Sequence, residues 1–274
     1  MESLVMAFNL GPALLFVPAD RPDFYSKGSV AADAVILDLE DAVAPHNRVS
    51  ARESLLQVPL DPSSTIIRIN ATTTEDFALD LKALSGTKYR YVMLPKSESA
   101  EQFEALSGYD VIALCESPLG ILNSSGIASC KNVIALMWGA ADLVASMGGI
   151  SSRHTSGQYR HVALQARSTV LLAAHARGKG AIDTVFFNIG DLSGLLEEAK
   201  DAAAIGFSAS ACIHPSQVSV IREAFIPSQT EISFALDLLD AASRQHGVFR
   251  FRDHMVDGPV IAHAKEILRR AGLK

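Results

Sequence analysis

The chain has 274 residues, of which 49% are hydrophobic and 20% are charged, and its formal net charge is −6. This composition indicates a folded protein with a large apolar core and excludes an intrinsically disordered chain. It also argues against nucleic-acid binding, which needs a basic surface, because no run of basic residues is longer than two.

Short apolar runs recur along the chain and predict β-strands, and stretches with helical spacing or composition lie between them. Strands that alternate with helices indicate βαβ units and a parallel sheet. Eight such units in a chain of this length predict an α/β fold, a closed (β/α)8 TIM barrel. An open doubly wound sheet is the alternative, which is less favoured because no GxGxxG or GxxxxGK[ST] turn follows a strand. The predicted strands are Leu14–Val17, Ala34–Leu39, Ile66–Ile69, Tyr91–Leu94, Val111–Cys115, Val133–Met137, Ile182–Phe187 and Ala209–Ile213. The predicted helices are Ala51–Gln57, Glu75–Leu84, Ala100–Leu106, Tyr159–Ala176 and Leu192–Ile205.

The first twenty residues are interpreted as leading into a first strand rather than as a signal peptide, because they lack a basic n-region. No apolar run is long enough to span a membrane. The three cysteines, Cys115, Cys130 and Cys212, have no CxxC spacing and predict neither a disulfide framework nor a zinc site. We therefore expect a cytoplasmic protein with no membrane partner.

Two segments beyond the sixth strand are of interest. Gly148–Tyr159 is rich in Gly and Ser and is either a mobile substrate lid or an ordinary surface loop. Helical stretches at Pro227–Gln245 and Pro259–Ala271 follow the last strand. We therefore predict a catalytic barrel over residues 1–226 and a C-terminal helical extension, or lid, over residues 227–274. This extension would cover the barrel mouth or reach a neighbouring subunit.

Polar residues follow most of the predicted strands. In a TIM barrel these positions share the rim formed by the carboxyl ends of the strands, where active sites lie. Glu116 and Asp142 follow the fifth and sixth strands, and two carboxylates placed together can share Mg²⁺, which prefers oxygen ligands. They could equally be surface acids that end two strands. The other rim residues are Asp20, Arg21, Asp38, Glu40, Asp41, Arg68, Lys96 and His214.

Several segments, in this order, resemble the motifs of citrate lyase β-subunit-like proteins. This group includes malyl-CoA and citramalyl-CoA lyases and falls within the HpcH/HpaI aldolase superfamily. The segments are LFVPADRPDFYSKG, VILDLEDAVAPHNRVSAR, IIRINA, VMLPKSES, ALCESPLGI, MWGAADL, CIHPSQV and HMVDGP. The chain differs from related sequences at Asp253, two residues before the Met of the last motif, where Gly is usual.

The resemblance implies a homotrimeric or hexameric barrel that uses Mg²⁺, or Mn²⁺, and acts on a CoA thioester. It implies that Glu116 and Asp142 hold the metal and contact the substrate, and that Arg68 binds the carboxylate and oxo oxygen of that substrate. Asp257 would be the acid/base that reaches in from an adjacent subunit. The remaining roles are groups behind the metal site, Asp38, Glu40 and Asp41, and CoA contacts, Asp20, Arg21 and Lys27.

The implied reaction is cleavage, or formation, of a 3-hydroxyacyl-CoA such as malyl-CoA or citramalyl-CoA, which yields an acyl-CoA and a 2-oxo acid. Arg68 in an apolar strand could instead form a structural ion pair with Glu40 or Asp41. Asp257 could simply cap a helix. An alternative function is that of a citrate lyase β subunit that acts on citryl-acyl carrier protein within a complex. A thioesterase or malate synthase-like side activity is a further possibility.

Overall fold

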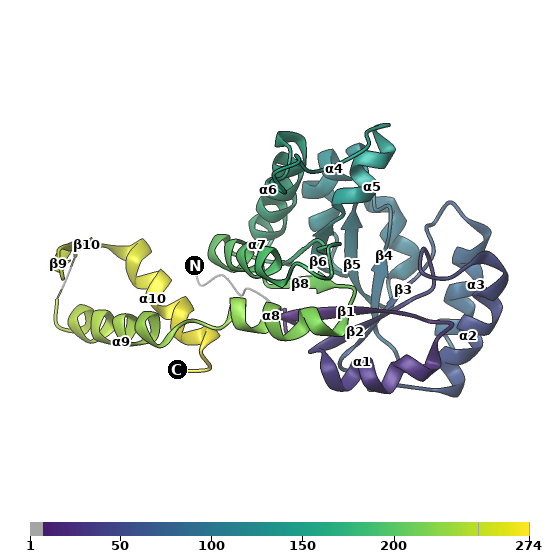
Figure 1. Cartoon of the computed structure of the whole chain (residues 1–274), viewed down its shortest axis with the longest axis horizontal. Helices are drawn as coiled ribbons and strands as arrows, with labels where there is room; N and C mark the ends of the chain where they lie inside the picture. The colour runs from purple at the N-terminus through teal and green to yellow at the C-terminus, as the bar shows by residue number, and fades with distance from the viewer. Residues whose placement is uncertain (1–7, 246, 274) are drawn as a thin grey trace. The chain divides into compact units, whose positions relative to one another are not determined.

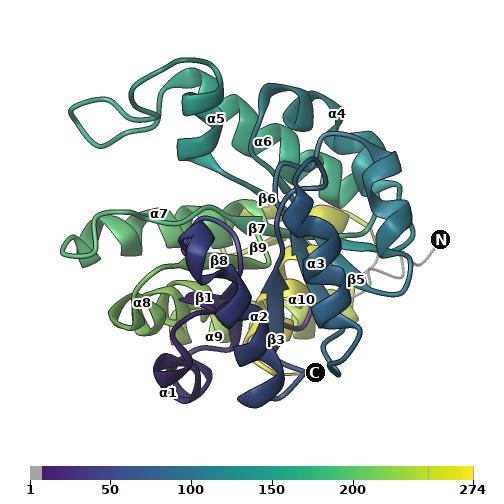
Figure 2. The same ribbon diagram turned by 90° about the vertical axis from the view of Figure 1, so that its right-hand side faces the viewer.

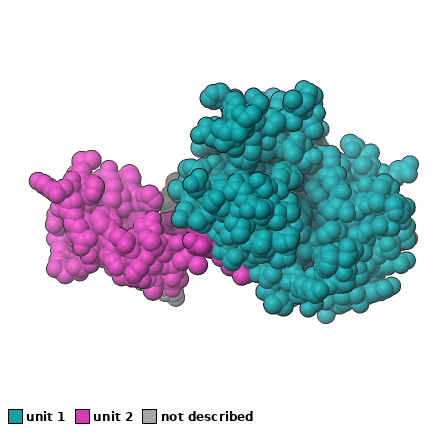
Figure 3. Space-filling view, viewed as in Figure 1, with its two compact units in different colours: residues 1–221 teal, residues 222–274 magenta. Residues whose placement is uncertain are grey.

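The computed structural model describes residues 8–245 and 247–273, which divide into two compact units. Unit 1 ends at Ile221 and unit 2 begins at Arg222, and each is described by itself (Figure 3). None of the described helices is long and apolar enough to cross a membrane.

Unit 1 is a closed barrel of eight parallel strands in the order β1 to β8, with β8 paired to β1. This confirms the predicted TIM-barrel fold. The helices of unit 1 lie outside the strands (Figures 1 and 2). The strands are β1 (Ala13–Pro18), β2 (Ala34–Asp38), β3 (Thr65–Arg68), β4 (Tyr91–Leu94), β5 (Asp110–Cys115), β6 (Val133–Trp138), β7 (Gly180–Asp183) and β8 (Ala209–Cys212). The α-helices that follow are α1 (Tyr25–Ala31), α2 (Arg48–Gln57), α3 (Glu75–Leu84), α4 (Pro118–Ala128), α5 (Ala140–Ser146), α6 (His161–Ala176), α7 (Leu192–Ile205) and α8 (Pro215–Phe225). The 3₁₀ helices are η1 (Pro22–Phe24), η2 (Pro45–Asn47) and η3 (Ala100–Leu106).

Apolar side chains from all eight strands fill the barrel interior. Because successive side chains of a strand point to opposite faces, alternate residues contribute to this core. Its fully or almost fully buried members include Leu14, Ile36, Ile66, Met93, Ile112, Met137, Ile182 and Ala211. The core ends below the rim, where the register places Asp38 beside Arg68 and Cys115 beside Trp138. The polar site is therefore built on top of a packed apolar plug.

The predicted strand Ile182–Phe187 has the wrong bounds. The strand is Gly180–Asp183, and the apolar run continues into the next loop, where Phe187 is exposed. The start of the strand was missed because glycine is uncommon within strands. A Cβ on Gly180 would lie 2.7 Å from Phe8 Cβ, so the close packing there requires glycine. Ala100–Leu106 forms a 3₁₀ helix, and the short helices α1 and α5 were not predicted because their patterns are brief.

Unit 2 is a helix, a β-hairpin and a second helix around a small apolar core. Its elements are α9 (Gln229–Ser243), β9 (Phe249–Phe251), β10 (His254–Val256) and α10 (Gly258–Arg270). Leu238, Val256 and Leu268 are buried in that core. The hairpin turn places Arg252 and Asp253 at φ values of 44° and 64°. Glycine is the usual residue for such a left-handed backbone, which accounts for its use in related chains where this one has Asp253.

Candidate active site

Arg68 ends β3 and is held mainly by Asp38, its neighbour at the end of β2. Its Nε and Nη2 donate to the two Asp38 carboxylate oxygens at 2.7 and 2.5 Å. Nη1 lies 3.1 Å from Glu40 Oε2 and 3.9 Å from Asp41 Oδ2. Burial disfavours the charged guanidinium, but the carboxylates of Asp38 and Glu40 more than offset this and raise the pKa of Arg68 above its ordinary value. The sequence interpretation named Glu40 or Asp41 as the partner and missed the main one.

Glu116 follows β5 and is almost completely buried, with 3% of its surface exposed. Its Oε1 accepts a hydrogen bond of 2.9 Å from the backbone N–H of Lys96. Gly139 packs directly against it, since a Cβ on Gly139 would lie 2.8 Å from Glu116 Cβ. Burial, the charge of Asp142 and the charge of Glu40 raise the pKa of Glu116 to about 8. The Lys96 N–H and the Arg68 charge favour the ionised carboxylate, but burial and the two neighbouring acids outweigh them.

Asp142 lies in the first turn of α5, the helix that begins directly after β6. The structure brings it close enough to Glu116 for its charge to act on that carboxyl. The turn before it is anchored by the backbone N–H of Ala140, which donates to Thr184 Oγ1 at 3.3 Å. Thr184 follows Asp183, the last residue of β7. The ends of β6 and β7 thus position Asp142.

A buried polar network supports this side of the rim, and the sequence did not reveal it. Asp183 accepts a hydrogen bond of 2.6 Å from Trp138 Nε1 and one of 2.7 Å from Arg167 Nη2. Arg167 Nη1 also donates to Asp201 Oδ2 at 2.5 Å. Arg167 lies in the middle of α6, and its buried charge is balanced by these two carboxylates. The only sequence signal was an Arg within an otherwise apolar helix face.

The sequence placed Lys96 on the rim but assigned it no role. Its Nζ pairs with Glu40 Oε1, while its backbone N–H binds Glu116. Burial raises the pKa of Glu40, against the opposing effect of the Arg68 charge. Glu40 Oε2 is buried and makes no hydrogen bond within the described part of the chain, although Arg68 Nη1 is near. One lysine therefore contacts two of the clustered acids.

Some charged side chains of this cluster form ion pairs and others do not. Arg68 pairs with Asp38 and Lys96 pairs with Glu40. Within residues 8–245 and 247–273, neither Glu116 nor Asp142 has an ion-pair partner. The same residues contain no group of three or more His, Cys, Asp and Glu side chains that could hold a metal ion. Two carboxylates without a cation fit a hard divalent ion that keeps several water ligands.

The other predicted site residues lie after β1 or in unit 2. Asp20 accepts a hydrogen bond of 2.8 Å from Asn47 Nδ2, and the exposed Arg21 forms a two-bond pair with Asp23. The Arg21 and Lys27 cations lie 4.1 and 6.0 Å from the centre of the Phe24 ring. Asp20 and Arg21 lie in the connection from β1 to α1, and Lys27 lies in α1 itself.

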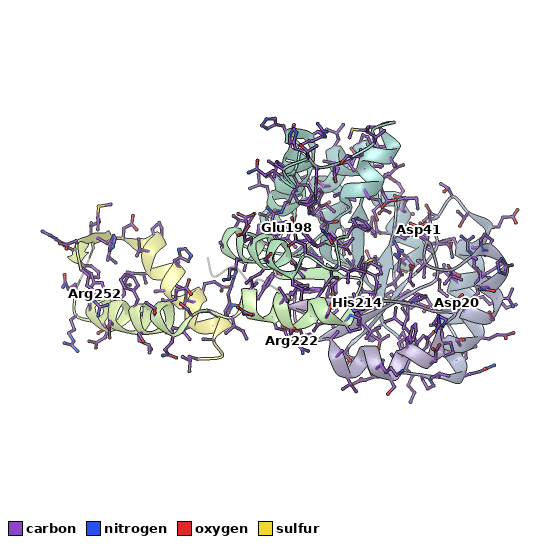
Figure 4. The ribbon with its side chains drawn as sticks, in the orientation of Figure 1. Asp20, Asp41, Glu198, His214, Arg222 and Arg252 are labelled. Atoms are coloured by element: carbon purple, nitrogen blue, oxygen red, sulfur yellow. The ribbon has the colours of Figure 1, made fainter. Side chains whose placement is uncertain are left out.

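Asp257 belongs to unit 2. It is the N-terminal cap of α10, and its Oδ1 accepts a hydrogen bond of 3.3 Å from Val260 N–H. Figure 4 labels Asp20, Asp41, Glu198 and His214 in unit 1 and Arg252 on the unit 2 hairpin.

The Gly148–Tyr159 segment is tied to α7 by one ionic cluster. Arg153 donates to both carboxylate oxygens of Glu198 at 3.0 and 2.7 Å, and Tyr159 Oη donates to Glu198 at 2.8 Å. The Arg153 guanidinium lies 3.7 Å from the centre of the Tyr159 ring, which in turn packs edge-on against Trp138. These contacts anchor the segment to α7, so any lid motion would be confined to the part of the segment that they do not hold.

The chain resembles known proteins over most of its length. Residues 13–215 match the model of the family described as HpcH/HpaI aldolase/citrate lyase. The chain belongs to this family. The match covers the whole barrel from β1 to β8, including every strand end that carries a candidate site residue.

Two curated family members show how far the similarity extends. A citrate lyase subunit beta-like protein of Mycobacterium tuberculosis H37Rv is 51% identical over 96% of both chains. The human mitochondrial citramalyl-CoA lyase is 30% identical over 94% of this chain and 85% of its own length. A crystal structure of the M. tuberculosis protein CitE contains magnesium, acetoacetate and coenzyme A. It superposes with a TM-score of 0.93, at 51% identity over 96% of this chain and 98% of that one.

Proposed function

We propose that this protein is a Mg²⁺-dependent carbon–carbon lyase that cleaves, or forms, a 3-hydroxyacyl-CoA of the malyl-CoA or citramalyl-CoA type. The observation that carries the proposal is the pair Glu116 and Asp142 on the barrel rim, which forms no ion pair within the described residues and lies within reach of the Arg68 charge. The metal and coenzyme A in the related crystal structure, and the activity named for the human relative, support the substrate class.

Glu116 and Asp142 are the residues that would hold Mg²⁺, with Mn²⁺ as a substitute. A divalent ion supplies Lewis acidity toward the oxygen of the nascent 2-oxo acid and relieves the repulsion between the two carboxylates. The Lys96 N–H holds Oε1 of Glu116, and the Thr184 anchor holds the turn that carries Asp142. These contacts fix both ligands before a cation arrives, which favours binding without rearrangement.

Arg68 would bind the carboxylate of the substrate through Nη1. Its Nε and Nη2 are already committed to Asp38, so the guanidinium is held rigidly and offers one further nitrogen. Glu40 and Asp41 lie near that nitrogen and would compete with an incoming carboxylate. A rigid, permanently charged donor stabilises developing negative charge more effectively than a mobile one.

Cleavage breaks the bond between the α carbon of the thioester and the carbon that bears the hydroxyl group. The hydroxyl oxygen loses its proton and becomes the oxo group, and the α carbon must gain a proton. Asp257 of a second copy of the chain would donate that proton, or remove it in the condensation direction. The β1–α1 connection, with Asp20, Arg21 and Lys27, would hold the CoA portion. A homotrimer or hexamer would supply the shared site.

The direct test is to incubate the purified chain with a panel of 3-hydroxyacyl-CoA esters and to identify products by mass. We expect an acyl-CoA and a 2-oxo acid in equal amounts, with turnover abolished by chelation and restored by Mg²⁺. Lys88→Met, on the exposed residue before β4, serves as a control that should retain full activity. Turnover of a citryl-acyl carrier protein without turnover of any CoA ester would favour the citrate lyase β-subunit function instead. Release of free CoA would indicate thioesterase activity.

The shared site has a separate test. Asp257→Ala and Arg68→Ala proteins should each be inactive, whereas a mixture that exchanges subunits should recover part of the activity. Mass spectrometry of the intact oligomer checks the exchange. Verified hybrids without recovered activity would contradict a site built from two subunits.

A further inference from the structure

Lys96 occupies an unusual backbone conformation at the end of β4. Its φ is 49°, in the left-handed region that L residues other than Asn, Asp and His seldom adopt. Two hydrogen bonds from the next residue hold this turn, since Ser97 Oγ donates to Leu94 O at 2.8 Å and Ser97 N–H donates to Leu114 O at 3.0 Å. Strained backbone of this kind persists only where the surrounding structure enforces it, and it is concentrated at functional sites.

The conformation has a specific result. It directs the Lys96 backbone N–H to Glu116 and allows the Lys96 side chain to reach Glu40. Glu40 is nearly buried, and its charge acts on Glu116 as that of Asp142 does. Glu116 thus stands within electrostatic reach of both Asp142 and Glu40, and Lys96 pairs with Glu40, which is not a proposed metal ligand.

We propose that Lys96 is a positioning residue that holds Glu40 away from the cation bound by Glu116 and Asp142, an inference that rests on the proposed metal site. The lysine is the only side chain that forms an ion pair with Glu40 Oε1 in the part of the chain that the structure describes. Without it, Glu40 would keep only the Arg68 guanidinium, 3.1 Å away, as a counter-charge, and its negative charge would act more strongly on Glu116. A third carboxylate would bind the cation more tightly and occupy room that the substrate oxygens need.

This role predicts that removing the lysine changes metal affinity and turnover in opposite directions. Loss of the lysine should tighten cation binding and impair the reaction, whereas a merely structural lysine would weaken both when removed. The gain should be larger for Ca²⁺, which accepts more oxygen ligands than Mg²⁺ and tolerates irregular geometry. Removing the positive charge of Lys96 should tighten Mg²⁺ binding by about threefold to tenfold.

The test is calorimetric titration of Mg²⁺ and Ca²⁺ into the full chain and five variants. Lys96→Met removes the charge but keeps the length of the side chain. Lys96→Asn removes it with a residue that accepts left-handed backbone, in case the Met variant folds poorly. Lys96→Arg keeps the charge, and Lys88→Met removes an equal charge from an exposed residue three positions before β4. The double variant Lys96→Met/Glu40→Gln removes both members of the pair.

We expect tighter binding in Lys96→Met and Lys96→Asn, together with a higher KM and a lower kcat for the CoA ester. The Arg variant, the Lys88 control and the double variant should bind Mg²⁺ as the unmodified protein does. Unchanged or weaker binding in folded Lys96→Met and Lys96→Asn would overturn the inference. Tighter binding that persists in the double variant would also overturn it, because Glu40 would then not be responsible. Failure of the unmodified chain to bind Mg²⁺ would instead count against the proposed function.

Discussion

Replacing Glu116 by Gln should stabilise the metal-free protein, even though it removes a proposed metal ligand. Glu116 is buried beside the charges of Asp142 and Glu40, and its pKa is raised from 4.5 to about 8. An ionised carboxylate at this position is therefore unfavourable when no cation is bound. The Gln side chain is neutral and of the same size, and it keeps an oxygen that can accept the hydrogen bond from Lys96 N–H.

The stabilisation expected from Glu116→Gln depends on pH. Because the pKa of Glu116 is higher in the folded chain than the unfolded value, ionisation costs stability above pH 4.5, and the cost grows until about pH 8. A pKa difference of one corresponds to about 1.4 kcal/mol, so a rise from 4.5 to about 8 sets a ceiling of about 5 kcal/mol. Relaxation and water screen part of this, and we expect Glu116→Gln to gain about 2–4 kcal/mol at pH 8 and almost nothing at pH 4.5.

The assay is urea unfolding of both proteins in the presence of a chelator, at several pH values between these limits. Glu197→Gln, on an exposed residue of α7, is the matched control and should change stability by less than about 0.5 kcal/mol at every pH. Added Mg²⁺ should stabilise the unmodified protein and leave Glu116→Gln unaffected. A variant that is less stable than the unmodified protein at pH 8, or a difference independent of pH, would refute the reasoning.

Three further substitutions probe the supporting structure. Asp38→Asn leaves the buried Arg68 charge without its main partner and should lower the free energy of unfolding by about 3–5 kcal/mol, measured in denaturant; an unchanged value would show that Glu40 suffices. Asp257→Ser keeps a side chain that caps α10, so the melting temperature should stay nearly constant while kcat falls by about a hundredfold or more. A parallel loss of both would point to a purely structural role. Arg153→Gln removes the ion pair with Glu198 and should speed amide hydrogen exchange across residues 148–159 severalfold, whereas unchanged exchange would mean that other contacts hold the segment.

The barrel could be predicted because the strands and helices differ strongly in pattern. The helices Glu75–Leu84 and Leu192–Ile205 were predicted with the ends that the structure shows, since their apolar spacing is long and regular. The strand near residue 182 was misplaced because its apolar run extends into a loop and its first residue is glycine. Propensity alone does not reveal a glycine that is required by close packing.

The sequence could predict which polar residues gather at the rim, but not how they pair. Placing acids at the ends of neighbouring parallel strands identified Glu116 and Asp142, and β5 and β6 are indeed neighbours. The choice of Asp38 as the partner of Arg68 depends on the register between β2 and β3, which the sequence does not contain. The contacts of Lys96 depend on a single left-handed residue, for which there is no periodic signal. The role of Asp257 remains a prediction that the hybrid experiment tests.

The central claim is that Glu116 and Asp142 together bind one divalent cation that the reaction needs. Calorimetric titration of Mg²⁺ into the chelator-treated chain, into Glu116→Gln and into Asp142→Asn tests it most directly. We predict one Mg²⁺ per chain for the unmodified protein and an affinity lower by at least about tenfold in each variant. Binding of equal strength and stoichiometry in all three proteins would contradict the claim.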